Sequence, residues 1–453
     1  MPKPSSTSVT LDVDVAAEPR LARQRTDTPF RILVLGDFSG RANRGEPPPG
    51  RLRPYLIDRD NFDGVLGRIH PELELGPRGG GLLLRFSELG DFHPDEIYSR
   101  ESFERFRVAA ESMAPMPAAP EPPPVTNLLD AGNLLDNVLE ATEAAPSRGL
   151  DPLQAFIERA AAPYKVPRED PRLGEKKARA AEAAAKLMRA VLHTADFQAL
   201  EAAWRALDWL VRALETGPQL KIYIADIAKA DLHDSLRELR RLLVDTAAAT
   251  PGAERWTLAV GNYTFARTEA DIATLAELAR IMRDAGAAFV AEADPREPGS
   301  EGVARDWQTL RKSPAASSIG LALPRFLLRL PYGKKTSPIE SFPFEEMPGT
   351  PAHGEYLWGN PAFACARVLG QAFSGDGWGS YAEITGLPLH VYESEGEQHA
   401  KPCAEVLMTE REAEWVLDQG FMPLVSIKNQ DAARLLRLQS VADPAAPLSG
   451  AWT

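Results

Sequence analysis

Between residues 220 and 323 the chain alternates short apolar runs with longer stretches of helical character, and this alternation restricts the possible folds more than any other sequence feature. We expect strands at 220–226, 256–261, 287–293 and 319–323, with helices at 232–243, 270–285 and 302–312. Strands and helices that alternate in this way imply a largely parallel sheet with helices on its faces. The sequence therefore predicts an α/β fold for this region.

Further elements are expected on both sides of this region. Residues 175–215 are expected to form one long helix or two. Six large apolar residues in it recur at helical spacing, which predicts a stripe that faces the core: Phe197, Leu200, Trp204, Leu207, Leu210 and Val211. A helix is expected at 361–373 and another at 410–419, closed by Gly420 at a C-cap position. Strands are expected at 387–392, 404–408 and 424–427.

A second, smaller α/β pattern precedes this one. A strand at 30–35 ends in the sequence GDFSG, and a helix at 61–69 follows with Asp60 as its N-cap. Residues 73–75 and 81–86 are expected to form a hairpin, and residues 95–110 a helix. Residues 29–112 are therefore predicted to form a small α/β unit.

Proline divides the chain. It accounts for 39 of 453 residues and clusters at 46–54 and 113–124, as is typical of extended linkers. We therefore expect an N-terminal strand and flexible leash (1–28), a small α/β domain (29–112, the N-terminal segment), a Pro-rich linker (113–126), an amphipathic helix and linker (127–174), a larger mostly parallel α/β domain flanked by helices (175–442, the C-terminal segment), and an unstructured tail (443–453).

The sequence SVTLDVDV at 8–15 alternates apolar and polar residues, which predicts a half-buried strand. Its apolar positions include Val9, Leu11 and Val13. A lone strand on a leash cannot bury its apolar face by itself, so it needs a sheet in its own chain or in a neighbour. The alternative is a frayed tail.

Residues 127–140 form the second isolated apolar pattern. Its apolar residues fall at roughly helical spacing: Leu128, Leu129, Leu134, Leu135 and Val138. A short amphipathic helix between proline-rich and polar stretches is either a docking segment or a helix packed on its own domain.

Composition excludes several classes of function. The net charge of −13 argues against nucleic acid or an anionic membrane as the main partner, because both attract basic surfaces. Two cysteines are too few for a disulfide framework or a thiolate metal site. The N-terminus has no apolar signal region, and no apolar run has the length of a membrane span. The cytosol is the simplest compartment.

Residues after the expected strands, several of them acidic, favour an enzyme hypothesis, because ligands of α/β sheets bind at these ends. The groups are Asp226, Gly261 with Asn262, and Glu292 with Asp294. The acidic side chains among them are suited to a metal with a phosphate, but acidic residues at such positions are also common turn formers and helix caps. No P-loop, H-E-x-x-H or G-x-S-x-G motif is present.

Two sets of sequences carry a family resemblance. PFRILVLGDFSG and IDRDNFDGVLGRI in the N-terminal segment resemble the small subunit (VipA/TssB-like) of the type VI secretion contractile sheath. DFQALEAAWRALDWLV, LPRFLLRLPYG and GEYLWGN in the C-terminal segment resemble its large subunit (VipB/TssC-like). The chain thus resembles the two sheath subunits fused in one polypeptide.

The resemblance implies a structural protein of the cytoplasm that uses no cofactor and no metal. Sheath subunits stack around a tube of hexameric rings, contract, and drive the tube outward from a baseplate. It implies that Val9, Leu11 and Val13 belong to a strand that links neighbouring subunits, and that a Clp-type ATPase grips the helix at 127–140. The match lacks the C-terminal region of the large subunit, so a non-contractile cap or an adaptor of sheath or baseplate is an alternative, and an α/β enzyme or ligand-binding protein another.

Overall fold

The computed structural model describes residues 29–48, 50–76, 81–111, 171–249, 252–375 and 382–452, without the side chains of 109–111 and 171–173. These residues belong to two compact units. Unit 1 combines the chain up to Arg100 with the chain from Ala185 onward, and unit 2 comprises Glu101–Ala184. Most of the described N-terminal segment therefore lies in the same unit as most of the C-terminal segment.

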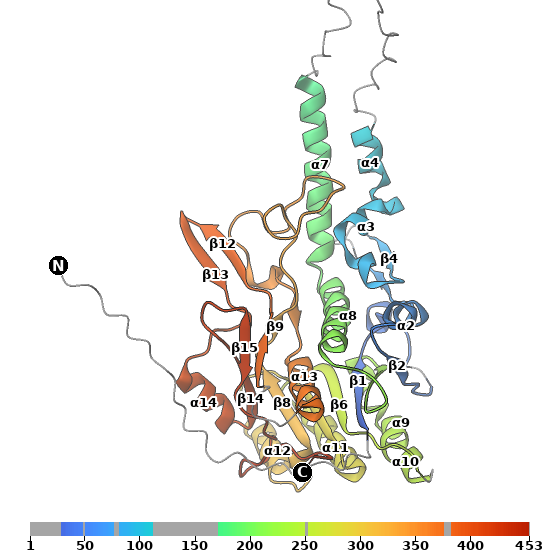
Figure 1. Ribbon diagram of the computed structural model, residues 1–453, viewed down its shortest axis with the longest axis vertical. Coiled ribbons are helices and arrows are strands. Elements are labelled where there is room, and N and C mark those ends of the chain that lie inside the picture. The colour runs from blue at the N-terminus through green and yellow to red at the C-terminus, as the bar shows by residue number, and fades with distance from the viewer. Residues whose placement is uncertain are drawn as a thin grey trace, which may run out of the picture. The chain divides into compact units, whose positions relative to one another are not determined.

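Unit 1 is built on a nine-stranded sheet of order β11-β15-β14-β8-β7-β6-β1-β5-β2 (Figure 1). These strands are β1 (Phe30–Gly36), β2 (Tyr55–Ile57), β5 (Leu220–Asp226), β6 (Leu258–Phe265), β7 (Ala288–Ala293), β8 (Ile319–Leu323), β11 (Glu383–Thr385), β14 (Phe421–Ser426) and β15 (Ala432–Leu435). The run from β14 to β5 is parallel, whereas β2 at one edge and β15 and β11 at the other pair antiparallel. The predicted α/β fold with a mostly parallel sheet is confirmed.

The remaining elements are helices and two-stranded sheets. The helices are α1 (Arg41–Arg44), α2 (Phe62–Ile69), α3 (Pro94–Ser99), α4 (Glu104–Glu111), α7 (Pro171–Leu192), α8 (Ala195–Ala213), α9 (Leu236–Arg240), α10 (Thr246–Ala249), α11 (Glu269–Ala285), α12 (Glu301–Arg311), α13 (Pro361–Ser374) and α14 (Glu410–Asp418). Three two-stranded sheets pair β3 (Glu72–Glu74) with β4 (Leu83–Arg85), β9 (Phe326–Leu327) with β10 (Trp358–Gly359), and β12 (His390–Ser394) with β13 (Glu397–Lys401). Helix α4 and the first part of α7 belong to unit 2.

A strand of the N-terminal segment occupies the middle of the sheet. β1 pairs with β5 from Phe30 opposite Leu220 to Gly36 opposite Asp226, and it pairs with β6 on its other side. A parallel strand with neighbours on both sides is covered on both faces, so it has a continuous apolar sequence. The strand FRILVLG fits this rule, since all its residues except Arg31 are buried. Residues 29–112 were expected to form a unit of their own, but β1 and β2 lie in the shared sheet because β1 has no polar face.

Helices cover both faces of the sheet. Leu33 and Leu35 of β1 lie in one hydrophobic core with residues of α9, α11 and α12. Phe30 points to the opposite face, because side chains alternate along a strand, and its ring centroid lies 5.1 Å from that of Phe373 on α13. Helix α13 packs on β6, β7 and β8 and against α8. The shared sheet is therefore the middle layer of three.

Several expected elements differ in detail. The helix expected at 95–110 is divided into α3 and α4, because Arg100 adopts an extended conformation with φ −71° and ψ 158°. The helix expected at 232–243 is shorter and passes into a π-helical turn at Arg241–Asp245. Residues 404–408 form a single bridge from Ala404 to Phe326 instead of a strand. The N-cap of α2 is Asn61 and not Asp60.

The tail after Pro444 has no helix or strand among its described residues, yet two of its side chains are buried. Leu448 is 2% exposed and Trp452 is 3% exposed. The Trp452 ring stacks on that of Phe30 with centroids 6.1 Å apart. The tail therefore covers the beginning of β1.

The predicted linker at 113–126 lies outside the described residues, so that boundary stays a prediction.

Gly261 of β6 lies where a side chain has no space. A Cβ atom at this position would lie 2.5 Å from Cζ of Phe289 and 2.9 Å from Cδ2 of Tyr263. We expect Gly261→Ala to reduce the free energy of unfolding by about 1–3 kcal/mol, the usual cost of overpacking a core. Urea unfolding measures the change. Gly299→Ala is the matched control, since nothing lies within 4 Å of its added Cβ, and an equal loss in both variants would contradict the prediction.

Candidate assembly interface

The residues that the sequence predicts to contact partners lie outside the described part of the chain. This holds for the expected strand with Val9, Leu11 and Val13. It also holds for the apolar residues of the expected helix at 127–140, which are Leu128, Leu129, Leu134, Leu135 and Val138. Their contacts stay predictions. The described residues show how the two segments are joined and which surfaces remain open.

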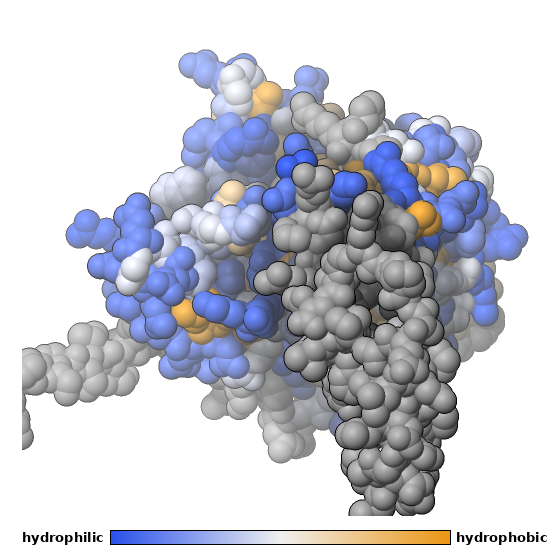
Figure 2. Space-filling view, turned by 90° about the horizontal axis from the view of Figure 1, so that it is seen from above, coloured by the Kyte–Doolittle hydropathy of each residue, from blue (hydrophilic) through white to orange (hydrophobic). Residues whose placement is uncertain are grey.

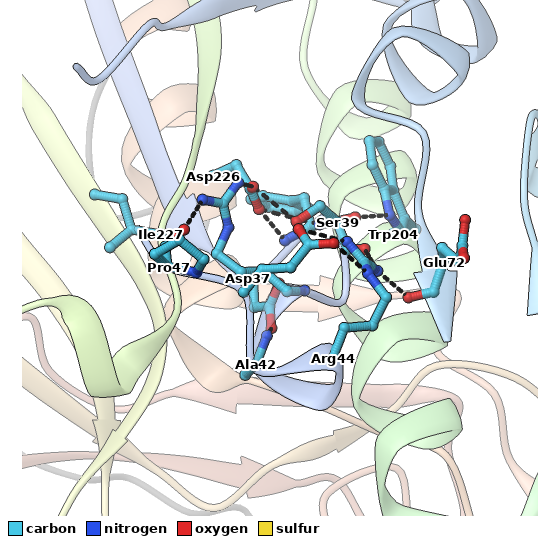
Figure 3. A network of polar contacts seen from close by, with 12 residues as sticks. Asp37, Ser39, Ala42, Arg44, Pro47, Glu72, Trp204, Asp226 and Ile227 are labelled. Carbon is cyan, nitrogen blue, oxygen red and sulfur yellow. Dashed lines mark hydrogen bonds and ion pairs between the residues drawn. The ribbon is translucent and has the colours of Figure 1, made fainter. Parts of the chain in front are cut away.

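Asp226, at the carboxyl end of β5, is the centre of the joint between the two segments (Figure 3). Its Oδ1 accepts hydrogen bonds from the backbone N–H groups of Phe38 and Ser39, at 2.8 and 3.0 Å. Its Oδ2 accepts from Ser39 Oγ and from Arg41 Nη2, both at 2.8 Å. Its side chain is 13% exposed. The GDFSG turn therefore saturates this carboxylate, which serves the fold and is not free to bind a cation.

Asp37 stabilises the same turn through hydrogen bonds to the backbone. Its carboxylate accepts from the backbone N–H groups of Arg41 at 2.8 Å and Ala42 at 2.9 Å, which open α1. Burial raises the pKa of Asp37, the hydrogen bond from Ala42 opposes this change, and the charge of Asp226 adds to it. The turn also needs Gly40, whose φ is 72° and whose Cβ would lie 2.5 Å from the carbonyl oxygen of Glu72.

Trp204 of α8 holds the turn from the helical layer. Its Nε1 donates a hydrogen bond to the carbonyl oxygen of Phe38 at 2.9 Å (Figure 3). Its ring meets those of Phe38 and Phe62 edge-to-face, with centroids 5.2 and 5.8 Å apart. Trp204 is fully buried, so the predicted core-facing stripe is confirmed. The large helix of the C-terminal segment thus closes over both β1 and α2 of the N-terminal segment.

The other strand-end groups are also engaged within the protein. Glu292 accepts from Thr264 Oγ1 at 2.8 Å, and burial raises its pKa. Asp294 accepts from Arg296 Nε at 2.7 Å. Gly261 and Asn262 do not end a strand, because β6 continues to Phe265. The described residues contain no group of three or more His, Cys, Asp or Glu placed to hold a metal ion.

Neither of the two cysteines is placed to react as a thiolate. Cys365 and Cys403 are both buried. Burial raises the pKa of the Cys365 thiol to about 12 and that of Cys403 to about 11. A thiol is nucleophilic only as the thiolate, so both act as small core residues.

A buried ion cluster around Arg329 was not found from the sequence. Arg329 lies in LPRFLLRLPYG, and its Nε donates to Glu201 Oε1 at 2.9 Å while its Nη1 donates to Glu346 Oε2 at 2.7 Å. Arg205 Nε also donates to Glu201, at 2.6 Å, and the backbone N–H of Tyr332 donates to Glu346, at 2.7 Å. Both carboxylates are fully buried. The cluster therefore ties α8 to the long connection between β9 and β10.

The pKa of Glu346 shows that the cluster compensates the charge of this carboxylate. Burial by itself raises the pKa of Glu346, but the Arg329 guanidinium, His193 Nε2 at 3.5 Å, and the hydrogen bonds from Arg329 and Tyr332 outweigh it and hold the pKa at about 2. Sequence signals for this cluster were weak, because arginine and glutamate are mostly surface residues. Its two halves, Glu201 with Arg205 and Arg329 with Glu346, are also far apart in the chain.

The open surface is mostly polar. In Figure 2 the coloured atoms are mostly hydrophilic, with small separate hydrophobic areas among them. Exposed large hydrophobic residues in the described chain are Leu56, Leu83, Val108, Val391, Val406, Leu407, Trp415 and Leu436. Leu56 lies on the edge strand β2, beside a cleft of about 470 Å³ that Arg59 and Lys221 also line. Edge strands of this kind are available for pairing with another chain.

Comparison with known families agrees with this geometry. The family described as the EvpB/VC_A0108 tail sheath N-terminal domain (VipB) matches residues 178–304 and 300–442. The chain belongs to this sheath family. The type VI secretion system family described as VipA, VC_A0107 or Hcp2 matches residues 7–102. The protein is thus a type VI secretion sheath protein with a VipA-like domain followed by a VipB-like domain, a structural and not an enzymatic family.

One curated relative extends the comparison. The type VI secretion system sheath protein TssC1 of Pseudomonas aeruginosa is 34% identical over 290 residues. The match covers 56% of this chain and 58% of the relative, so this chain spans only part of the length of that sheath protein. Among the described residues, no helix combines the length and the apolar character that a membrane crossing requires.

The Asp226 joint gives a direct test. We expect Asp226→Asn to reduce the free energy of unfolding by about 2–3 kcal/mol, because hydrogen bonds to a charged group are worth more than neutral ones and the Arg41 partner becomes unpaired. Urea unfolding followed by tryptophan fluorescence measures the loss. Asp234→Asn, at an exposed carboxylate, is the matched control. Equal stability of both variants would show that the joint does not depend on Asp226.

We expect a substitution of Arg329 to reduce the free energy of unfolding more than the substitution of Asp226 does. Removing one partner of a buried ion cluster leaves an uncompensated charge, so Arg329→Met should cost about 3–5 kcal/mol of unfolding free energy. Arg434→Met, at an exposed pair with Glu383, should cost at most about 1 kcal/mol. Urea unfolding at neutral pH compares the two. Similar losses in both variants would contradict the argument.

The pH dependence distinguishes lost charge pairing from lost packing. The pKa of Glu346 is about 2 in the folded chain and 4.5 for the ordinary group. A depressed pKa contributes stability above the ordinary value, and that contribution is lost as the pH falls toward the folded value. Acidification from about pH 5 should therefore destabilise the wild type more than Arg329→Met, in which Glu346 lacks its main partner.

Proposed function

We propose that this protein is a fused sheath subunit of a type VI secretion apparatus, which assembles with further copies around an inner tube and supports ejection of that tube. The observation that carries the proposal is the position of β1 between β5 and β6. A VipA-like strand in the centre of a VipB-like sheet makes both sheath segments parts of one body. The single chain fixes their ratio at one to one.

The rigidity of this body suits a polymer that transmits force. The parallel ladder, the Asp226 joint and the Arg329 cluster connect sheet, turn and helical layer inside unit 1. Packed cores do not deform continuously, so a contracting polymer changes the contacts between rigid subunits instead. We therefore assign the movement of a contractile sheath to the links between copies.

We assign the links to the two isolated apolar segments of the sequence, residues 8–15 and 127–140. The strand with Val9, Leu11 and Val13 extends the sheet of a neighbouring copy by strand addition. The helix of residues 127–140 is available to a Clp-type ATPase that takes the polymer apart, through the apolar face formed by Leu128, Leu129, Leu134, Leu135 and Val138. These assignments rest on the sequence pattern and on the family.

The same proposal defines the partners and the compartment. The protein contacts itself, a hexameric inner-tube protein and baseplate components in the cytoplasm. The net charge of −13 supports protein partners over nucleic acid or anionic lipid. No cofactor is required, and the carboxylates Asp226, Glu292 and Asp294, on which an α/β enzyme would depend, are engaged in internal contacts.

Negative-stain electron microscopy tests the proposal. The full chain is examined alone and with the tube protein of its system, at matched concentration. Tubes or stacked rings are expected, and they should lengthen when the tube protein is present. Cogwheel-shaped ends would also support the sheath role. Monomers or small oligomers in both samples would contradict the sheath role and favour an adaptor of sheath or baseplate.

A further inference from the structure

Helix α13 is apolar over most of its length and contains one charged residue, Arg367. Its sequence is PAFACARVLGQAFS, and ten of its fourteen residues are buried. Arg367, Gln371 and Ser374, at spacings of four and three residues, lie on one side of the helix and reach the surface. A helix that is hydrophobic almost all round belongs to a core. A charge in the middle of such a helix therefore needs a physical reason.

The guanidinium of Arg367 has no anionic partner in the part of the chain that the structure describes. Its Nε is buried and has no acceptor there, and burial lowers the pKa of Arg367 without a carboxylate to oppose the change. Arg31 and Arg41 also have a buried Nε without an acceptor. Their guanidinium groups, however, form ion pairs with Glu254 and Asp226, respectively. Arg367 thus bears the cost of burying a charge without this compensation.

Trp209 of α8 lies against the same guanidinium. The Cζ atom of Arg367 is 4.7 Å from the centroid of the Trp209 ring, and that centroid is 5.0 Å from the centroid of the Phe326 ring. Trp209 is partly exposed, and its indole N–H has no acceptor among the described residues, whereas the indoles of Trp204 and Trp256 donate to carbonyl oxygens. The cation–π contact positions the guanidinium but leaves its N–H groups without acceptors.

The site therefore combines hydrogen-bond donors with a positive charge, and it lacks an acceptor. A guanidinium presents its N–H groups in a rigid plane, and a carboxylate can accept two of them at once. Such bidentate pairs are stronger than hydrogen bonds between neutral groups. Arg367 would repel a cationic partner, and an apolar partner would leave the donors unsatisfied. The site is therefore suited to a carboxylate.

A second copy of this chain can supply that carboxylate. The sequence contains 64 acidic and 51 basic residues, so carboxylates are in excess. Helix α14, for example, carries Glu410, Glu414 and Asp418 at successive turns, all exposed and none ion-paired with another described residue. Copies with a net charge of −13 also repel one another. A contact between copies is therefore favoured where a cation of one meets a carboxylate of the other.

We propose that Arg367, held by Trp209, binds a carboxylate of a second copy in the assembled polymer. The proposal rests on the proposed self-assembly and adds one specific residue to it. In the free subunit the charge of Arg367 lacks a partner, and assembly provides one. Arg367 thus lowers the stability of the free subunit and strengthens the contact between copies, as residues kept for function often do.

The variant Arg367→Met separates these two effects. It removes the charge and retains an unbranched apolar side chain beside Trp209. We expect the urea midpoint of the unassembled subunit to be unchanged or higher, because a partly buried unpaired cation is removed. We expect the concentration needed for polymerisation to rise by at least about tenfold, because the contact between copies loses a charged hydrogen-bond donor. Urea unfolding and sedimentation of polymers measure the two quantities.

The control is Arg305→Met, at an exposed arginine of α12, which should match the wild type in both measurements. A lower urea midpoint in Arg367→Met would assign Arg367 to the stability of the subunit and would overturn the proposal. Polymerisation of Arg367→Met at the concentration of the wild type would overturn it as well.

Crosslinking identifies the partner. The variant Arg367→Lys keeps the positive charge, and a carbodiimide joins a lysine amine to a carboxylate in contact with it. Isotopically labelled and unlabelled Arg367→Lys subunits are mixed, assembled, crosslinked and digested. Mass spectrometry should find the peptide with residue 367 linked to an acidic peptide of the opposite label, which places the carboxylate on a second copy. The wild type, with arginine at this position, should give no such product.

The remaining outcomes keep the two proposals distinct. Links from residue 367 only within one label, only to an added tube protein, or to no peptide overturn the assignment to a second copy and leave the sheath role intact if the wild type polymerises. A wild type that forms no polymer contradicts the sheath role. In that case mixed-label products from smaller oligomers still support the Arg367 contact, and their absence overturns it as well.

Discussion

The insertion of β1 between β5 and β6 is the constraint on which the rest of unit 1 depends. Without β1 the sheet would be interrupted at its centre, and the backbone donors and acceptors of β5 and β6 would lose their partners in a buried region, which is costly. Asp226 then fixes the turn that leaves β1, because four hydrogen bonds reach its two oxygens. The segments are thus joined by backbone pairing and by charge.

The Arg329 cluster is a second constraint of a different kind. A buried ion pair contributes little net stability, because desolvation offsets most of the attraction, but it penalises any arrangement that separates its members. Glu201 on α8 and Glu346 in the β9–β10 connection are both satisfied only when Arg329 lies between them. The cluster therefore specifies where the long connection lies on α8. A subunit that must keep its shape in a polymer benefits from such specificity.

The open surfaces and the closed ones have different origins. Carboxylates that resemble ligand sites in the sequence are closed by their neighbours, as Asp226 is by Ser39 and Arg41. Exposed apolar side chains such as those of Leu407 and Trp415 are open because no described element covers them. In a protein of a sheath family, surfaces of the second kind are where partners are expected, and those of the first kind maintain the subunit.

The sequence by itself determined the α/β class, the limits of β5 and β8, the burial of Trp204 and the family, because these follow from local apolar periodicity and from runs of characteristic residues. Tertiary structure alone decided that β1 lies between β5 and β6 and that Arg329 lies between Glu201 and Glu346. Strand neighbours such as Phe30 and Leu220, and ion pairs such as Glu201 and Arg329, join residues more than a hundred positions apart, and local patterns carry no information on such pairings. A proline-rich stretch separates the two segments in the sequence, but pairing in space depends on which apolar strand completes the core.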